Sequence, residues 1–282
     1  MNFPVIVKWA ITDKCNLKCK HCYKNNHVNE ITKEDVDLII QELKHKGIGC
    51  VALTGGEPLV AKQFMYIVQE LHKYGIETEI ASNGFMMSDK MIDYLFKNNI
   101  KVVQISIDGY DGDSNDYIRG KGVYDIVTEN IRNIVCKGIK VVLAHTLNHY
   151  NCNDIERIIS LADELGVSAI RLERYIPVME DKYKLRLDRN DIEFIKNCSI
   201  KYLDRKNIVF PIFHENSNCG AGEYMAMINS DMTLSPCDLL SDFIRSDLMI
   251  DDNHSIEYIW NNDIILNNWR KNKYIGCKLV DD

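Results

Sequence analysis

Short apolar runs alternate with amphipathic stretches along the first 175 residues of the chain. The apolar runs predict β-strands at residues 5–11, 51–54, 77–81, 102–107, 140–147 and 168–173. Between them, apolar residues recur at helical spacing over residues 33–46, 62–74, 88–98, 123–137 and 153–165. This repeated order is typical of a parallel sheet in which each strand is followed by a helix.

Residues that begin or end helices support these boundaries. Thr32 followed by Asp35 approximates a capping box, and Ser88 and Asp154 suit the start of a helix. A glycine follows each of four predicted helices and precedes a strand, as C-terminal caps do: Gly47, Gly75, Gly138 and Gly166.

The pattern changes near residue 176, where we place a domain boundary. Residues 177–209 are expected to form a linker with a bridging helix near 189–205. Residues 210–282 are expected to form a smaller C-terminal region. In it, two short strands flank a turn at Asn229–Asp231, and a helical stretch precedes Cys277.

Composition and charge exclude several classes of function. The 282 residues are 46% hydrophobic, and the net charge of −7 without a basic run argues against a nucleic-acid partner. The chain has no long apolar run, and its N-terminus is typical of a strand, not of a signal peptide. We therefore expect a cytoplasmic protein without a membrane partner, in which the ten cysteines point to metal more than to disulfides.

Three cysteines are closely spaced, as Cys15-x3-Cys19-x2-Cys22. A cubane 4Fe-4S cluster has four irons, so three thiolates leave one iron open to a substrate or cosubstrate. A zinc site and unligated thiols are the alternatives. Zinc motifs usually add a second cysteine pair or histidines at a fixed distance, and only His21 and His27 are near.

A second motif, Gly55-Gly56-Glu57-Pro58, follows the strand predicted to end at Thr54. Two glycines let the backbone approach a ligand closely, and Glu57 adds an acceptor suited to an ammonium group. Taken alone, the motif equally fits a turn with a helix-starting proline. Its place about 30 residues after the cysteines favours a ligand site.

Together these motifs resemble those of the radical S-adenosylmethionine enzymes. The resemblance implies an α/β fold with a partial (β/α)6 TIM-like barrel over residues 1–176. It also implies a 4Fe-4S cluster with an open iron that chelates S-adenosylmethionine. One electron then cleaves this cosubstrate to a 5′-deoxyadenosyl radical, which abstracts a hydrogen from an unactivated carbon. The matching residues are Cys15, Cys19, Cys22 and Tyr23, then Gly55 to Pro58, Ser82-Asn83-Gly84 and Ser106-Ile107-Asp108-Gly109.

The resemblance also gives roles to the loop residues. Glu57 and the Gly55–Gly56 backbone would receive the methionyl amino group, and Ser82 and Asn83 would serve the same ligand. His21 occupies the position at which the family usually has an aromatic residue near adenine, and shielding of the cluster is its alternative role. Tyr23 and Pro58 complete this part of the predicted cofactor site.

Two further pairs of residues would bind the rest of the cosubstrate. Ser106 and Asp108 lie on the same side of one strand and suit a ribose diol, with a simple strand-end turn as the alternative. Arg119 and Arg171 are candidates for the carboxylate, because an arginine can pair with it through two parallel hydrogen bonds. For each arginine, a surface ion pair is the alternative.

Lysines interleave with the cysteine ligands: Lys14, Lys18, Lys20 and Lys24. They form either a solvated loop or a docking patch for an acidic electron donor of the flavodoxin or ferredoxin type.

The C-terminal region resembles the SPASM or twitch extensions of radical S-adenosylmethionine maturases. By that resemblance, Cys219, Cys237 and Cys277 would ligate an auxiliary 4Fe-4S cluster, whereas plain thiols of a structural cap are the alternative. Met232 replaces the glycine usual in this motif, and the family's later cysteines are missing, so we expect no full SPASM module. The fourth ligand would be Asp281, Cys198, substrate or solvent, or lost by truncation.

We therefore expect a radical S-adenosylmethionine enzyme that modifies a ribosomally made peptide, by a thioether, a carbon–carbon crosslink or an epimerisation. Because the first predicted strand begins at once, we expect no added leader-binding domain, which weakens the peptide hypothesis. Oxidation of a small alcohol or sugar-like molecule is the alternative, and a non-catalytic iron–sulfur scaffold or electron-transfer protein is the alternative from another class. Cys198 is a candidate hydrogen-atom donor, whereas Cys50, Cys136 and Cys152 are expected to be packing residues.

Overall fold

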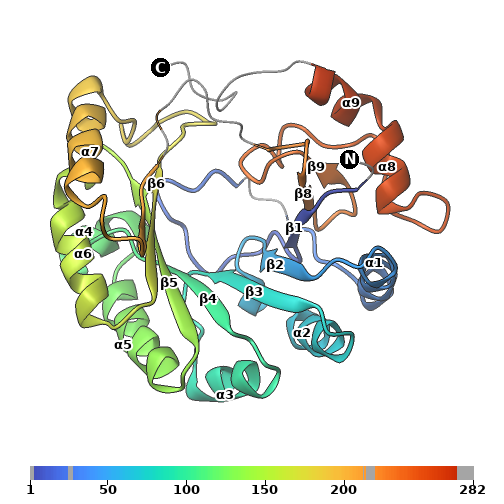
Figure 1. The fold of residues 1–282 in the computed structure, drawn as a ribbon, viewed down its shortest axis with the longest axis horizontal. Helices are drawn as coiled ribbons and strands as arrows, with labels where there is room; N and C mark the ends of the chain where they lie inside the picture. The colour runs from blue at the N-terminus through green and yellow to red at the C-terminus, as the bar shows by residue number, and fades with distance from the viewer. Residues whose placement is uncertain (1–2, 25–27, 212, 214–219, 272–282) are drawn as a thin grey trace.

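The chain folds around one curved sheet, the central ribbon of Figure 1. The computed structural model describes residues 3–24, 28–211, 213 and 220–271. In spatial order the strands are β7 (Ile208–Val209), β6 (Ala169–Arg174), β5 (Lys140–Leu147), β4 (Val102–Ser106), β3 (Glu77–Ser82), β2 (Cys50–Thr54), β1 (Ile6–Ala10), β8 (Met225–Ile228) and β9 (Leu234–Ser235). Neighbouring strands are parallel except β8 and β9, and the sheet stays open between its edges β7 and β9. This confirms the predicted partial barrel.

Helices cover the outer face of the sheet (Figure 1). Those that follow the strands are α1 (Lys33–His45), α2 (Phe64–Lys73), α3 (Asp89–Lys97), α4 (Gly112–Arg119), α5 (Val123–Cys136), α6 (Ile155–Glu164) and α7 (Arg189–Lys201), with 3-10 turns at Pro58–Val60 and Cys152–Asp154. Near the β8–β9 edge lie α8 (Ile256–Asn262) and α9 (Ile264–Lys271). Within the described residues, no helix is long and apolar enough to cross a bilayer.

Local capping explains why these helices begin and end where they do. Thr32 and Asp35 form the predicted capping box of α1, and the Ser88 side chain accepts from Met91 N at the start of α3. Asp154 precedes α6 but makes no side-chain capping bond. The four glycines that follow helices have φ values of +66°, +71°, +87° and +68°, the left-handed conformation that glycine adopts without strain.

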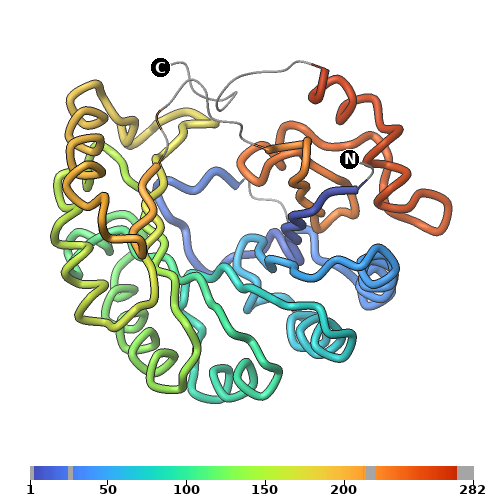
Figure 2. The backbone as a smooth tube through the Cα atoms, in the orientation of Figure 1, coloured from blue at the N-terminus to red at the C-terminus, as the bar shows by residue number. Residues whose placement is uncertain are grey.

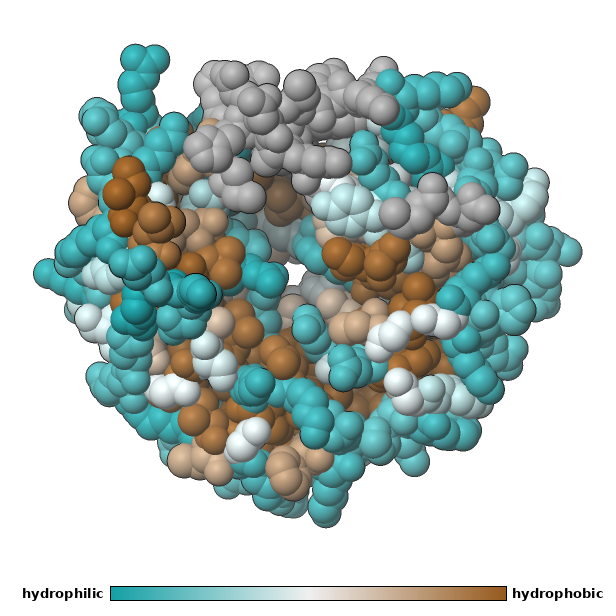
Figure 3. All heavy atoms as spheres, in the orientation of Figure 1, coloured by the Kyte–Doolittle hydropathy of each residue, from teal (hydrophilic) through white to brown (hydrophobic). Residues whose placement is uncertain are grey.

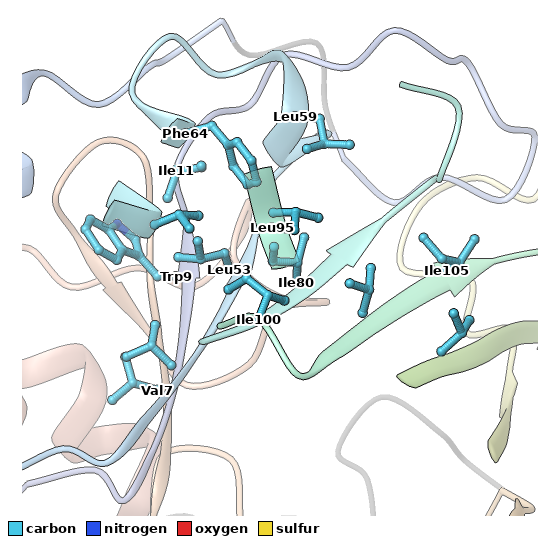
Figure 4. Close-up of a cluster of buried hydrophobic side chains, with 14 of the residues drawn as sticks. Val7, Trp9, Ile11, Leu53, Leu59, Phe64, Ile80, Leu95, Ile100 and Ile105 are labelled. Carbon is cyan, nitrogen blue, oxygen red and sulfur yellow. The ribbon is translucent and has the colours of Figure 1, made fainter. Parts of the chain in front are cut away.

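Alternation along the strands separates an inner from an outer face. On β1, Val7 and Trp9 are at most 1% exposed, and they join a core that lies between the sheet and the helices (Figure 4). Lys8 lies between them in sequence and therefore faces the inner side of the curve. Figure 3 shows the molecule hollowed at its centre, inside this curve.

The C-terminal segment is part of the same sheet. β8 pairs with β1 in parallel, with Lys8 opposite Met227, and β9 forms the predicted hairpin with β8. The N-terminal strand therefore lies beside the C-terminal segment, as the tube in Figure 2 shows. Lys46, just after α1, forms an ion pair with Glu257 and so ties α1 to α8.

Candidate active site

The predicted motifs meet at one edge of the sheet. Residues 11–24, which carry Cys15, Cys19 and Cys22 and are called the cysteine loop below, follow β1. The loop from Gly55 to Pro58 follows β2, Asn83 follows β3 and Asp108 follows β4. Because these four strands are parallel neighbours, their carboxyl ends lie side by side.

The cysteine loop presents its three thiols together. Cys15 and Cys22 are exposed, Cys19 is half-buried, and all three are free. Burial raises the pKa of Cys19 to about 11, Arg119 opposes this, and the other two cysteines add to it. Leu17 N also donates to Cys15 Sγ at 3.4 Å. Three neighbouring thiols, one of which already accepts an N–H bond, fit a cluster held by three thiolates.

Gly55 and Gly56 lie against the backbone of the cysteine loop. Gly56 N donates to Thr12 O at 2.7 Å, and Glu57 N donates to Lys14 O at 2.8 Å. A Cβ on Gly55 would lie 2.3 Å from Thr12 O, and a Cβ on Gly56 would lie 2.3 Å from Lys14 O. These glycines therefore make the predicted close approach to the backbone of the cysteine loop, and not to a ligand. A larger residue at either position would push that backbone away.

Glu57 joins this loop to the end of β3. Its carboxylate is buried, and Oε1 accepts from Leu59 N at 3.2 Å and from Ser82 Oγ at 2.8 Å. Oε2 accepts from Asn83 N at 2.7 Å. Burial raises the pKa of Glu57, and these bonds oppose the rise. Both carboxylate oxygens thus accept hydrogen bonds from protein groups, which differs from the predicted contact with an ammonium group.

Asn83 brings the end of β3 to the first cysteine. Its Nδ2 donates to Asn16 Oδ1 at 2.8 Å and lies 3.9 Å from Cys15 Sγ, while its Oδ1 accepts from Phe85 N at 3.0 Å. Asn16 was missed by the sequence reasoning, although its position directly after a cysteine ligand is a usable signal.

Asp108 also differs from its predicted role. Its Oδ2 lies 2.6 Å from His21 Nε2 and 2.7 Å from Arg119 Nε, and its Oδ1 accepts from Thr146 N at 2.8 Å. Burial raises the pKa of Asp108, but Arg119 and His21 outweigh it and hold the pKa far below its ordinary value. Because protein groups enclose the carboxylate, it is not presented to a ribose. His21 and Arg119 are likewise turned toward Asp108.

Ser106 and Arg171 lie on the inner face of the sheet. They are at the same level, because each is opposite Ala144 in the strand register. Arg171 Nη1 donates to Gln104 Oε1 at 3.2 Å, and its Nε lies 4.0 Å from Glu173 Oε1. With its side chain half exposed, Arg171 is the arginine that faces the hollow, whereas Arg119 is buried.

Two of the four interleaved lysines are used inside the protein. Lys14 Nζ lies 2.6 Å from Glu30 Oε2. Lys24 is nearly buried, donates to Ser241 Oγ at 2.8 Å and lies 3.3 Å from Asp242 Oδ1. Lys24 therefore anchors the cysteine loop to the C-terminal segment and cannot belong to a docking patch.

The other two lysines remain at the surface. Lys20 Nζ lies 3.1 Å above the centre of the Tyr117 ring, which stacks on Tyr150 with ring centres 4.1 Å apart. Lys18 is exposed and makes no ion pair with the described part of the chain. A docking patch is thus limited to Lys18, Lys20 and these aromatic rings.

A charged pair inside the curve was missed by the sequence reasoning. Lys8 Nζ lies 2.8 Å from Asp238 Oδ2, and Asp238 and Glu173 raise the pKa of Lys8. Burial, together with Asp238, Cys22 and Cys237, raises the pKa of Tyr23 well above its ordinary value. Tyr23 and the Lys8–Asp238 pair therefore lie near both the cysteine loop and Cys237. The sequence signal for this pair was Lys8 itself, a single lysine between the apolar residues Val7 and Trp9 of the first strand.

Only one of the three predicted auxiliary ligands lies within the described residues. Cys237 is half-buried, and its Sγ donates to Asp238 Oδ1 at 3.6 Å. Cys219 and Cys277 lie outside the described residues.

The segments next to these cysteines contact each other. A Cβ on Gly222 would lie 3.1 Å from Pro236 Cβ, so the segment after Cys219 lies beside the residue before Cys237. Trp269 Nε1 of α9 donates to Ala221 O at 2.8 Å. Met232, which replaces the expected glycine, has φ +67° and keeps the backbone conformation that glycine favours.

Cys198 does not face the inner side of the sheet. It lies on α7, is 5% exposed and belongs to the core between the sheet and its helices. The hydrogen-atom donor role predicted for Cys198 therefore has no support from its position, and packing explains it.

Known proteins are similar to this chain in sequence or in fold. The sporulation killing factor maturation protein SkfB of Bacillus subtilis is 28% identical over 84% of this chain and 60% of its own length. The Fe-coproporphyrin III synthase of Methanosarcina barkeri is 33% identical over 59% of this chain and 43% of its own length, so the chain spans about half of these relatives. The crystal structure of Streptococcus suis SuiB bound to precursor peptide SuiA superposes with a TM-score of 0.80 at 16% identity, over 96% of this chain and 67% of that chain. The model of the Radical SAM superfamily matches residues 9–162, more than half of the chain, and the protein therefore belongs to this superfamily.

Proposed function

We propose that the protein is a radical S-adenosylmethionine enzyme that modifies a ribosomally made peptide. The observation that carries the proposal is that the ends of β2 and β3 both contact one cysteine loop. Gly56 and Glu57 bind the loop backbone, and Asn83 lies beside Cys15. Electron transfer alone would need no such arrangement, whereas a cosubstrate site beside a cluster needs its loops fixed in place.

The cofactor site would be built as follows. A 4Fe-4S cluster on Cys15, Cys19 and Cys22, with S-adenosylmethionine bound, would supply a 5′-deoxyadenosyl radical. Burial raises the pKa of Cys15, and the hydrogen bonds that Leu17 N and Asn83 Nδ2 direct toward Cys15 Sγ oppose this rise. Burial also raises the pKa of Cys19, and Arg119 opposes the rise there.

The peptide substrate is supported by the relatives and by the shape of the inner face. SkfB is named a maturation protein of the sporulation killing factor, and SuiB is described as bound to its precursor peptide. The hollow seen in Figure 3 is open to solvent, and Arg171 and Glu173 present charged groups to it. An open hollow that carries a few charged groups suits a flexible chain that enters from outside.

We also infer an auxiliary 4Fe-4S cluster on Cys219, Cys237 and Cys277. Its support is the contact between the segments that flank these cysteines, namely Gly222 with Pro236 and Trp269 with Ala221. Measured iron would separate the two cases: about eight irons per chain support two clusters, and about four support one.

Cosubstrate cleavage tests the main proposal. Anaerobically reconstituted protein, mixed with dithionite and S-adenosylmethionine, should release 5′-deoxyadenosine, measured by mass spectrometry. A variant with Cys15, Cys19 and Cys22 all changed to Ala should release none. Cys136→Ala, an exposed cysteine at the end of α5, is the matched control and should behave as the wild type. Equal release by the triple variant would overturn the proposal.

Isotope transfer tests the substrate class. A candidate precursor peptide, deuterated at its Cα and Cβ positions, should transfer deuterium to 5′-deoxyadenosine and change its own mass. Deuterium transfer from a labelled small alcohol, without transfer from any peptide tried, would show that the substrate is a small molecule and not a peptide.

A further inference from the structure

We propose that Asp108 is a positioning residue that holds His21 and Arg119 together and thereby keeps the protein beside the cysteine loop electrically balanced. The inference rests on the proposed cluster at this loop. It concerns residues that are not ligands of the cluster.

The geometry at Asp108 is fixed on every side. Its side chain is 0% exposed, and Oδ2 lies 2.6 Å from His21 Nε2 and 2.7 Å from Arg119 Nε. Its backbone N donates to Asn115 Oδ1 at 3.0 Å, and its backbone O accepts from Asn151 Nδ2 at 3.0 Å. A carboxylate held in this way has one position, so it fixes the two side chains, His21 and Arg119, that contact it.

Asp108 thereby joins three segments that are far apart in the sequence. His21 lies between Cys19 and Cys22, Arg119 ends α4, and Asp108 follows β4. A second contact reinforces the same junction, because Lys20 N donates to Ile118 O at 2.9 Å. His21, at a position where the family usually has an aromatic residue, is thus one of the residues that tie the cysteine loop to the end of β4.

The charges of Arg119 and Asp108 oppose each other at Cys19. Asp108 Oδ2 contacts both Arg119 Nε and His21 Nε2, and His21 lies between Cys19 and Cys22, so the two charges lie beside the cysteine ligands. His145, the other titratable side chain close to Asp108, is buried, and burial lowers its pKa, so it adds no charge. The Asp108–Arg119 pair is therefore neutral as a unit. Removing either member would leave one uncompensated buried charge.

Iron–sulfur clusters respond to such a charge through their reduction potential. A nearby positive charge favours the reduced cluster, which carries the extra electron, and a nearby negative charge disfavours it. Asp108→Asn should therefore make the potential more positive, and Arg119→Gln should make it more negative. The double variant removes both charges and should return close to the wild-type potential.

The experiment is a potentiometric titration of the reconstituted proteins, followed by electron paramagnetic resonance. Asp113→Asn is the matched control, because Asp113 is an exposed carboxylate on α4. The cluster of this variant should have the reduction potential of the wild type. Opposite shifts in the two single variants and recovery in the double variant would support a balanced pair. A role limited to folding would not produce opposite signs.

The remaining outcomes separate this inference from the proposed function. If the wild type takes up no cluster, both fail together. If the wild type takes up a cluster and the single variants keep its potential, or shift it in the same direction, only this inference is overturned. If Asp108→Asn does not fold, the test compares Arg119→Gln with the double variant. The inference then requires a more negative potential in Arg119→Gln and a potential close to that of the wild type in the double variant.

Discussion

Lys24 and Asp242 form a nearly buried ion pair across 218 positions of the sequence, with Lys24 Nζ 3.3 Å from Asp242 Oδ1. The same ammonium group donates to Ser241 and lies 3.9 Å from Asp13 Oδ1. Arg245 Nη2 lies 3.0 Å from the same oxygen of Asp242. The end of the cysteine loop is thus attached by charge to the segment that follows β9.

Replacing Lys24 by Met should destabilise the protein. The Asp242 and Asp13 side chains are at most 4% exposed, so the change leaves buried carboxylates without this cation. Breaking a buried pair typically costs about 3–5 kcal/mol, and we expect about 3 kcal/mol because Asp242 keeps Arg245. Urea unfolding measures the loss. Lys18→Met, at an exposed lysine of the same loop, should change stability by less than about 0.5 kcal/mol. Equal stability of the two variants would show that the pair contributes nothing.

Gly56→Ala should disturb the cysteine loop. The new Cβ would lie 2.3 Å from Lys14 O and 2.5 Å from Asp13 O, so backbone atoms must move. Forcing such an overlap typically costs about 1–3 kcal/mol. We expect a loss of this size together with at least a tenfold lower release of 5′-deoxyadenosine. Gly49→Ala is the control, because a Cβ there meets nothing within 4 Å. Wild-type release by Gly56→Ala would contradict the proposed contact between the two loops.

Much of the fold was predictable because the apolar pattern repeats. Each predicted apolar run marked a strand, and Thr32 and Ser88 marked the starts of α1 and α3. The helix expected near 189–205 begins as predicted but ends at Lys201. The helix α4 was missed because its sequence, GDSNDYIR, has few apolar positions. Its start was nevertheless encoded, since Asp111 and Ser114 form a capping box.

The candidate site was predictable as a set of segments but not as a set of contacts. Parallel strands bring their carboxyl ends together, so the motifs after β1 to β4 had to meet. Which partner each polar group takes depends on contacts between distant residues. Asp108 looked like a ligand for ribose, yet His21 and Arg119 enclose it. Glu57 looked like a ligand for an amine, yet Ser82 and Asn83 occupy it.

The His149–Asp191 pair predicts a pH-dependent contribution to stability. His149 Nδ1 lies 2.7 Å from Asp191 Oδ2. Hydrogen bonding and attraction to Asp191 raise the pKa of His149, so its contribution is present below the ordinary value near 6.5 and is lost as pH rises through the folded value. Burial raises the pKa of Asp191, but bonds from Asp188, His149 and Cys152 outweigh it and lower the pKa. Its contribution is therefore present above about pH 4 and is lost on acidification.

The difference in stability between wild type and His149→Gln should therefore be largest near pH 6 and should shrink toward pH 9 and pH 3. Because the His149 side chain is 55% exposed, we expect a maximum below about 1 kcal/mol. Urea midpoints at the three pH values measure it. A difference that stays constant from pH 6 to pH 9 would exclude the charged pair as its cause.

Charge reversal at Lys18 and Lys20 should slow reduction by an acidic electron carrier. Both lysines belong to the cysteine loop, and neither forms an ion pair with the described residues, so each is available to a carboxylate of a partner. Stopped-flow reduction by a reduced flavodoxin should be about tenfold slower in Lys18→Glu/Lys20→Glu at low salt, and the difference should fade as salt screens the charges. Lys90→Glu/Lys97→Glu makes the same change in net charge at exposed positions of α3, far along the chain from the loop. If this control slows reduction as much, overall charge and not a docking site at the cysteine loop governs the encounter.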